Sequence, residues 1–265
     1  MTDLLIGVRC FIRGFSLMLT PGVRSWAFIP MILSALLYVG LIWAAAEWMG
    51  PHLDDLETSL DASLPSWLDW VSAILGPLLW ILYWLAALLV VTFTFVIVAS
   101  VVASPFNGPL AEAAEHALTA QAPPTTSWLR ILTRLPGVLI QETKKVLYAV
   151  FWSIPFLLLL FIPIVGQILW FLWNAWITAL AFTDYPLDNN GFRFADMRRM
   201  LRRRHWAAYG FGAAALFTFT IPILNLFAVP ASVCGATLLW IEVLRPQAVA
   251  EGWHPPPTNG QPSDS

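Results

Sequence analysis

The chain has 265 residues, of which 58% are hydrophobic and 11% are charged, and its mean hydropathy is +0.71. A soluble core cannot absorb this proportion of apolar side chains, so the composition excludes a soluble globular protein and indicates a polytopic membrane protein. The net charge of −2 argues against general nucleic-acid binding. Because no Gly/Ser-rich or low-complexity stretch divides the chain, we expect one membrane domain over residues 1–245 and a disordered tail over residues 246–265.

Four long apolar blocks contain no charged residue: Ser25–Ala46, Trp70–Ala111, Val146–Thr183 and Trp206–Ile241. Lys and Arg residues lie before the first block, between the second and third, between the third and fourth, and after the fourth. The segment Glu47–Asp69 has acidic residues and no basic ones. Because Lys and Arg in short loops stay cytoplasmic, this segment is predicted to be the only connection on the outside. The third and fourth blocks are then predicted to begin and end on the cytoplasmic side of the membrane.

The first residues predict an amphipathic helix that lies in the membrane surface. Apolar side chains recur at helical spacing over residues 4–19, while Arg9 and Arg13 lie four residues apart on another face. Thr, Pro and Gly at residues 20–22 are expected to end this helix.

The next two blocks predict two long transmembrane helices. Ser25–Ala46 has about the 20 residues that a span needs. In the second block the continuous apolar stretch is Leu78–Ala103, and the prolines and glycine within residues 105–109 are expected to end it near the inner surface. A short surface helix is expected over Glu112–Leu118.

The third and fourth blocks share one design, in which an apolar arm, an Ile-Pro-Ile turn and a second arm follow one another. The turns lie at residues 162–164 and 221–223, and the first arms have only about 17 and 15 residues, fewer than a span needs. We therefore expect two re-entrant, half-penetrating helical hairpins, whose turns must be covered by neighbouring protein, and hence a homo-oligomer. The predicted fold is an all-α integral membrane protein with two long transmembrane helices, these two hairpins and the N-terminal amphipathic helix.

No group of residues in the sequence has the spacing of a catalytic or metal site. A Gly-rich phosphate loop, a His/Cys ligand set and a Ser, His and acid grouping are all missing. The four histidines stand alone, and Cys10 and Cys234 are too few and too far apart for a metal set or a disulfide framework. We therefore expect no enzyme activity, no cofactor and no bound metal.

The turn around Gly22, Val23 and Arg24 is the best candidate for binding an anion. It joins the surface helix to the N-terminus of a membrane helix, where free backbone N–H groups and the positive helix end gather. Arg24 adds a fork of donors that suits a tetrahedral oxyanion. The alternative is that Pro21 and Gly22 only end one helix while Arg24 reaches lipid phosphate.

A cluster of five arginines follows the third block: Arg198, Arg199, Arg202, Arg203 and Arg204. It either fixes topology and faces lipid headgroups or raises the local anion concentration. Acidic residues that border the apolar blocks are candidates for proton coupling or for ion pairing with these arginines, and they include Glu112, Glu115, Asp184 and Glu242.

Four stretches of the chain match motifs of a known family of membrane proteins. They are PGVR at residues 21–24, SPFNGPLAE at 104–112, DYPLDN at 184–189, and residues 221–237, where IPILNLF precedes Pro230 and VCGAT. They occur in the family's order and together extend over most of residues 5–245. On these motifs the chain resembles the CysZ-type bacterial sulfate permeases, within the broader etoposide-induced-protein-like membrane family.

The resemblance implies a sulfate transporter of the bacterial inner membrane that supplies cysteine biosynthesis. It also implies two long membrane helices, two half-penetrating hairpins, assembly as an oligomer, and sulfate and membrane lipids as partners. The family's sulfate-binding motif is Gly-Leu-Arg, which Gly22, Val23 and Arg24 match with Val in place of Leu. A membrane scaffold or biogenesis protein without transport activity is the alternative function.

Overall fold

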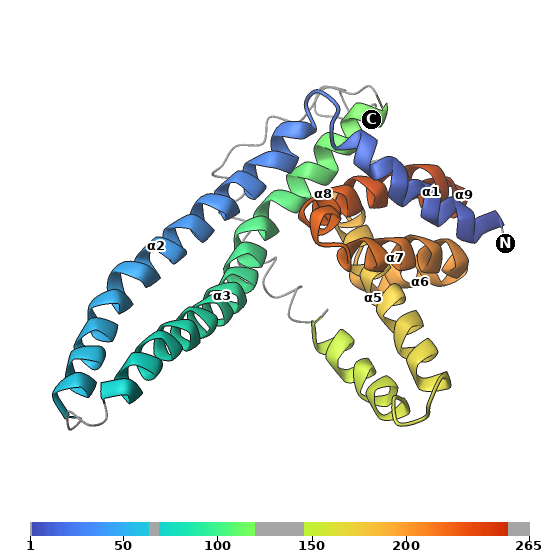
Figure 1. Ribbon diagram of the computed structural model, residues 1–265. Helices are drawn as coiled ribbons and strands as arrows, with labels where there is room; N and C mark the ends of the chain where they lie inside the picture. The colour runs from blue at the N-terminus through green and yellow to red at the C-terminus, as the bar shows by residue number, and fades with distance from the viewer. Residues whose placement is uncertain (1, 64–68, 120–145, 254–265) are drawn as a thin grey trace. The chain divides into compact units, whose positions relative to one another are not determined.

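The computed structural model describes residues 2–63, 69–119 and 146–253, and within these ranges the regular structure is helical, with no strand (Figure 1). The helices are α1 (Thr2–Leu17), α2 (Arg24–Ser63), α3 (Asp69–Thr119), the helix Val146–Leu159, α5 (Val165–Asn189), α6 (Phe194–Arg203), α7 (His205–Phe219), α8 (Pro222–Leu239), the π-helix η2 (Trp240–Leu244) and α9 (Arg245–Ala250). The prediction of an all-α protein is confirmed for this part of the chain.

Contacts between backbone positions divide the chain into two compact units. The first contains Met1–Phe28 and Pro105–Ser265, and the second contains Ile29–Ser104. Within the second unit α2 and α3 contact each other, since the Tyr83 hydroxyl donates to the carbonyl of Ala45 at 3.4 Å. The single membrane domain over residues 1–245 stays a prediction.

Three helical segments in the described residues are long and apolar enough to cross a membrane: Arg24–Trp48, Val165–Asn189 and Phe227–Ala250. The first contains the predicted span Ser25–Ala46. The other two are the second arms of the predicted hairpins, and their length suits either a full span or a tilted arm. The chain is therefore a membrane protein, while the re-entrant arrangement of the hairpins stays a prediction.

Both long helices continue further than the sequence indicates. α2 runs through Pro51 to Ser63, so most of the predicted outer connection is helical. α3 runs without interruption through Pro105 and Pro109, and the prediction that it ends there is wrong. Packing explains the difference, because tertiary contacts between the two prolines and directly after Pro109 hold the helical conformation: the Asn107 amide donates to the Tyr185 hydroxyl at 3.1 Å and Leu110 is buried.

The predicted amphipathic helix is present as α1, but the face that the protein buries overlaps the predicted apolar stripe only in part, at Phe11 and Phe15. Gly7, Cys10, Phe11 and Gly14 are buried, and they lie on the side that packs on α7 and α8. The large side chains Leu5, Ile12 and Leu19, by contrast, are exposed. The sequence pattern missed part of the buried face because glycine contributes almost nothing to an apolar periodicity.

Glycines bring the backbones of these helices into direct contact. A Cβ on Gly7 would lie 2.0 Å from the carbonyl oxygen of Ala207 in α7, and one on Gly14 would lie 2.1 Å from that of Ala231 in α8. The same holds between α7 and α5, where a Cβ on Gly212 would lie 1.9 Å from the carbonyl oxygen of Ala175. Figure 1 shows α1, α7 and α8 lying together as one layer, so small residues set the spacing of the helical core.

The third block forms the predicted helix-turn-helix. Val146–Leu159 packs on α5 through Phe156, whose ring stacks on Trp173 with centroids 4.8 Å apart, and Trp173 Nε1 donates to Ser153 Oγ at 2.8 Å. The turn is tight, because Ile164 has φ 65° and a Cβ on Gly166 would meet the carbonyl of Leu159.

The fourth block also forms a helix-turn-helix, made of α7 and α8. Its turn closes at residues 220–221, where the N–H groups of Thr220 and Ile221 donate to the last carbonyls of α7. Both turns therefore lie at the predicted Ile-Pro-Ile positions.

The beginning of the C-terminal tail is ordered, unlike the predicted disorder from residue 246. Arg245–Ala250 forms α9, and Trp253 packs its ring against Phe192 and Trp240 at 5.4 Å from each centroid. The aromatic contact supplies the buried apolar area that composition alone did not reveal. Residues 254–265 lie outside the described residues.

Replacing Gly7 or Gly14 with Ala should destabilise the protein, because each added methyl group meets backbone that cannot move aside without separating α1 from its neighbours. We expect a loss of about 1 to 3 kcal/mol per substitution, the range for overpacked cores, measured as a lower unfolding midpoint in detergent. Gly40→Ala in α2 is the matched control, since nothing lies within 4 Å of its Cβ position and Ala is the better helix former. Equal midpoints for all three variants would contradict the close-packing account.

Candidate functional site

The predicted anion-binding turn connects α1 to α2 through residues 18–23. Thr20 organises it, because its carbonyl accepts from the N–H groups of both Val23 and Arg24, at 3.2 and 3.1 Å. The Thr20 hydroxyl in turn donates to the carbonyl of Leu17 at 2.7 Å. These bonds occupy two of the N–H groups that the sequence indicated as free.

Gly22 and Val23 have different structural roles in this turn. Gly22 has φ 89°, a left-handed conformation that favours glycine, and it is exposed. Val23 is completely buried in the hydrophobic core, next to the α2 residue Ala27. One turn further along α2, Phe28 meets Phe227 of α8 with ring centroids 6.4 Å apart. Val23 is therefore the anchor of the turn.

Arg24 is the first residue of α2, and its side chain is exposed. Among the described residues it has no ion pair or side-chain hydrogen bond. A cation at the first position of a helix lies at the positive end of the helix dipole, where it is unfavourable for helix stability but adds to the field that an anion experiences. The turn thus presents a guanidinium group and the start of a 40-residue helix at one place.

Glu115 on α3 is held by two neutral donors from other helices. Asn190 donates its amide to one carboxylate oxygen at 2.8 Å, and the buried Trp240 donates Nε1 to the other at 3.3 Å. Near it, Asn189 donates to the carbonyl of Gly108 at 2.9 Å. The SPFNGPLAE and DYPLDN motifs therefore meet in space, and Glu115 joins α3 to α5 and η2.

Glu242 on η2 forms an ion pair with Arg13 on α1, and Cys10 directs its thiol toward the same carboxylate at 4.0 Å. Burial raises the pKa of the Cys10 thiol to about 11, with a contribution from the Glu242 charge. Glu242 therefore pairs with an arginine of the surface helix rather than with the arginine cluster. The π-helix allows Trp240 and Glu242, two residues apart, to reach α3 and α1 respectively.

Asp184 on α5 is buried and lines a cavity of about 180 Å³. The cavity wall includes Tyr148, Tyr185 and Phe194 together with aliphatic side chains, so its surface is mostly apolar. The fourth acidic candidate, Glu112, is half-buried on α3, three residues before Glu115. A coupling role for any of the four acids stays a prediction.

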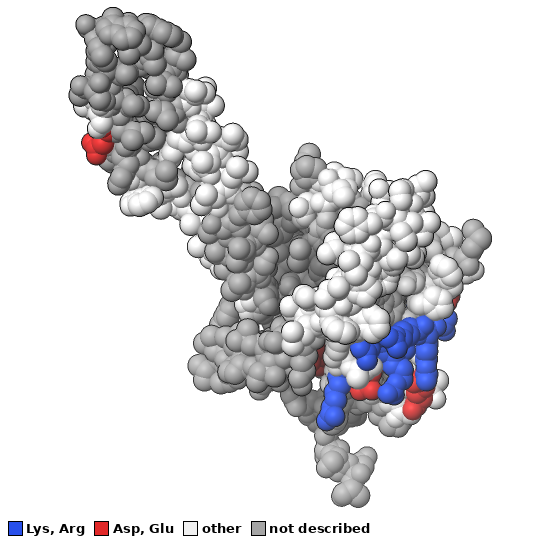
Figure 2. Space-filling view, turned by 90° about the horizontal axis from the view of Figure 1, so that it is seen from below, with Lys and Arg blue, Asp and Glu red and all other residues white. Residues whose placement is uncertain are grey.

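The arginine cluster lies on α6 and at its end, and Figure 2 shows the basic side chains gathered on one face. Arg203 pairs with Glu251 and Arg204 with Asp3, while Arg199 lies 3.8 Å from Asp196. Two of these three partners are more than 40 residues away along the chain. A single sequence carries no signal for such pairs, and we did not predict them.

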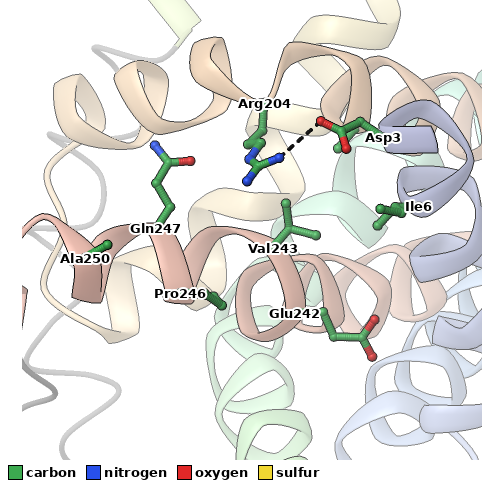
Figure 3. A pocket seen from close by; sticks show the side chains of 9 residues that line it. Asp3, Ile6, Arg204, Glu242, Val243, Pro246, Gln247 and Ala250 are labelled. Carbon is green, nitrogen blue, oxygen red and sulfur yellow. Dashed lines mark hydrogen bonds and ion pairs between the residues drawn. The ribbon is translucent and has the colours of Figure 1, made fainter. Parts of the chain in front are cut away.

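A pocket of about 490 Å³ opens beside Arg204 (Figure 3). Its charged lining consists of Arg204, Asp3 and Glu242, and Gln247 directs its amide toward it. The charged groups of this pocket are already paired, Arg204 with Asp3 and Glu242 with Arg13, so the pocket offers a dianion no unpaired cation. The exposed turn at Arg24 has no such opposing charge among the described residues, so it remains the better place for an oxyanion.

Comparison with known proteins gives the same family as the sequence motifs. The family described as "Sulfate transporter CysZ/Etoposide-induced protein 2.4" matches residues 10–230. A protein of Pectobacterium atrosepticum named "Sulfate transporter CysZ" is 39% identical over 244 residues, which is 90% of this chain and 86% of that protein. A protein of Salmonella typhimurium with the same name is also 39% identical, over 90% of this chain and 93% of its own length. The chain therefore belongs to the CysZ/etoposide-induced protein 2.4 family of membrane proteins.

Proposed function

We propose that this protein takes up sulfate across the bacterial inner membrane for assimilation into cysteine. The observation that carries the proposal is 39% identity over nine-tenths of the chain to proteins named sulfate transporters. The exposed turn at Gly22–Arg24 supports it, because the turn offers an oxyanion both a guanidinium and a helix N-terminus. Transport of this kind involves no bond making, so no catalytic group is required.

Arg24 is the principal sulfate ligand in this proposal. Its planar guanidinium can donate two parallel hydrogen bonds to two sulfate oxygens. The N–H and hydroxyl of Ser25 are next to it and complete a set of donors on the same turn. Gly22 leaves room for close approach, since nothing lies within 4 Å of its Cβ position, and Val23 holds the turn in place from the core.

The two hairpins are proposed to enter the membrane and return. Their turns expose large apolar side chains and no charge, with Phe161 at 86% and Ile164 at 71% exposure in the first turn. Water disfavours such a turn, whereas lipid or a second copy of the protein accommodates it. In the second hairpin, α7 has 15 residues and rises about 22 Å, short of the roughly 30 Å hydrocarbon core. A homo-oligomer would cover the polar backbone of the turns.

The acids that border the apolar helices are the candidates for ion coupling. Asp184 is the strongest of them, because it is 4% exposed and lines a mostly apolar cavity. Glu115 and Glu242 have the partners described above, which suits a structural role. Glu112 completes this set.

The function is tested with purified protein in liposomes, by measuring the uptake of radiolabelled sulfate down its gradient. We expect uptake above that of protein-free liposomes, and competition by an excess of unlabelled sulfate but not of chloride. If liposomes with correctly inserted, folded protein take up no more sulfate than protein-free liposomes, the result would instead favour the scaffold function.

Arg24→Ala should weaken sulfate binding more than Arg202→Ala, measured by calorimetry or radiolabel binding. Losing one charged hydrogen-bonding partner costs about 1.5 to 3 kcal/mol, or roughly ten- to a hundredfold in affinity. Arg202 is the matched control, since it is also exposed and has no ion pair among the described residues, but it shares its charge with neighbouring arginines. Arg24→Lys should restore only part of the affinity, because an ammonium group cannot bind two oxygens in one plane. Unchanged affinity in a folded Arg24→Ala protein would return Arg24 to a lipid-anchoring role.

Topology can be measured by labelling single cysteines from outside intact cells. Asp61→Cys should be labelled, whereas Ala195→Cys and Ala250→Cys should not, because Arg193 and Arg198 flank the first of these positions and Arg245 precedes the second. The native Cys10 and Cys234 are buried, so their background labelling is expected to be low. Ile164→Cys tests the hairpin: labelling as efficient as at position 61 would make the third block a full span and refute the re-entrant arrangement.

A further inference from the structure

The face of α6 opposite the protein core is a second charged surface that sulfate transport does not explain. Met197, Met200 and Leu201 are buried at helical spacing and fix α6 to the core. The cluster of five arginines, from Arg198 to Arg204, consequently lies on the outer side and at the end of the helix (Figure 2). We refer to these five residues as the arginine surface.

Acidic neighbours neutralise only part of the arginine surface. Arg199, Arg203 and Arg204 each have one carboxylate within ion-pair distance, at solvent-exposed positions where such pairs are weak and exchange readily. Arg202 is exposed and, among the described residues, has no ion pair. Arg198 is placed over an aromatic ring instead of an acid, with its guanidinium carbon 4.9 Å from the Tyr148 centroid. The surface therefore keeps a positive excess at Arg198 and Arg202.

Apolar and aromatic groups lie directly beside these charges. Trp206 follows the cluster and is 55% exposed, with its ring 6.4 Å from that of Tyr209. Arg204 pairs with Asp3 of α1, and Leu5, two residues further along α1, is 63% exposed. A soluble anion would need only the charges, whereas a phospholipid presents a phosphate to arginine and its glycerol and acyl carbons to Trp and Leu.

We propose that the arginine surface binds the headgroup of an anionic phospholipid, with Arg198 and Arg202 as the main phosphate ligands. Trp206 and Leu5 contact the lipid below its phosphate. Bound lipid would hold α6 and the end of α1 at the membrane surface. The proposal rests on the membrane location of the protein and not on transport itself, so the two can fail separately.

Native mass spectrometry of the full chain in detergent tests it, with phosphatidylglycerol as the probe and phosphatidylcholine as the neutral comparison. We expect tighter binding of phosphatidylglycerol. The double variant R198Q/R202Q should lose about 25-fold in affinity for it, since each basic residue at an anionic membrane surface contributes about fivefold. Neither substitution removes an ion pair with an acid, so the fold should be retained, and an unchanged unfolding midpoint checks this.

Arg9→Gln is the control for losing a positive charge elsewhere, because Arg9 is exposed on α1 and lies outside the arginine surface. It should leave the affinity for phosphatidylglycerol unchanged, and so should Arg24→Ala, even if that variant no longer binds sulfate. Equal binding of the two lipids, or equal affinities of R198Q/R202Q and the unaltered protein, would overturn the proposal. Displacement of phosphatidylglycerol by inorganic sulfate would also overturn it and assign the surface to soluble anions.

Discussion

The structure depends on the direct backbone contact between α1 and the hairpin formed by α7 and α8. Inside a membrane the hydrophobic effect does not drive helices together, because lipid is as apolar as leucine, so association needs close van der Waals contact. Gly7 and Gly14 supply that contact at both ends of α1, and Gly212 supplies it between α7 and α5. These contacts fix α1, which the sequence predicts to lie in the membrane surface, against the core. The turn that follows α1, residues 18–23, is thereby also held in position.

Polar contacts then join further helices of this unit. Glu115 receives neutral donors on both carboxylate oxygens, from α5 and from η2. Satisfying both oxygens matters because an unpaired carboxylate is costly wherever water is scarce. The Glu242–Arg13 pair, by contrast, is partly exposed and links η2 to α1. Structural pairing accounts for both acids.

Periodicity and charge distribution predicted the helical class, the surface helix, the first span and the positions of both hairpin turns, because these depend on local pattern. Three features depended on contacts that a pattern does not contain. Part of the buried face of α1 was missed because it consists of glycines, which add little to an apolar pattern. α3 continues through Pro105 and Pro109 because of tertiary contacts. Aromatic packing orders the chain as far as Trp253. The partners of Arg13, Arg203 and Arg204 lie far away in sequence, so no spacing rule could identify them.

Arg24 differs from Arg13, Arg203 and Arg204 in having no carboxylate partner among the described residues. Arg13, Arg203 and Arg204 each have a carboxylate partner, which lowers the net field they offer to an approaching anion. Arg24 has none among the described residues, and it lies at a helix start that would be more stable with an acid or a neutral cap there. The cost is understandable if an anion supplies the missing negative charge, and the core packing of Val23 and of the α1 glycines keeps the turn ready to receive it.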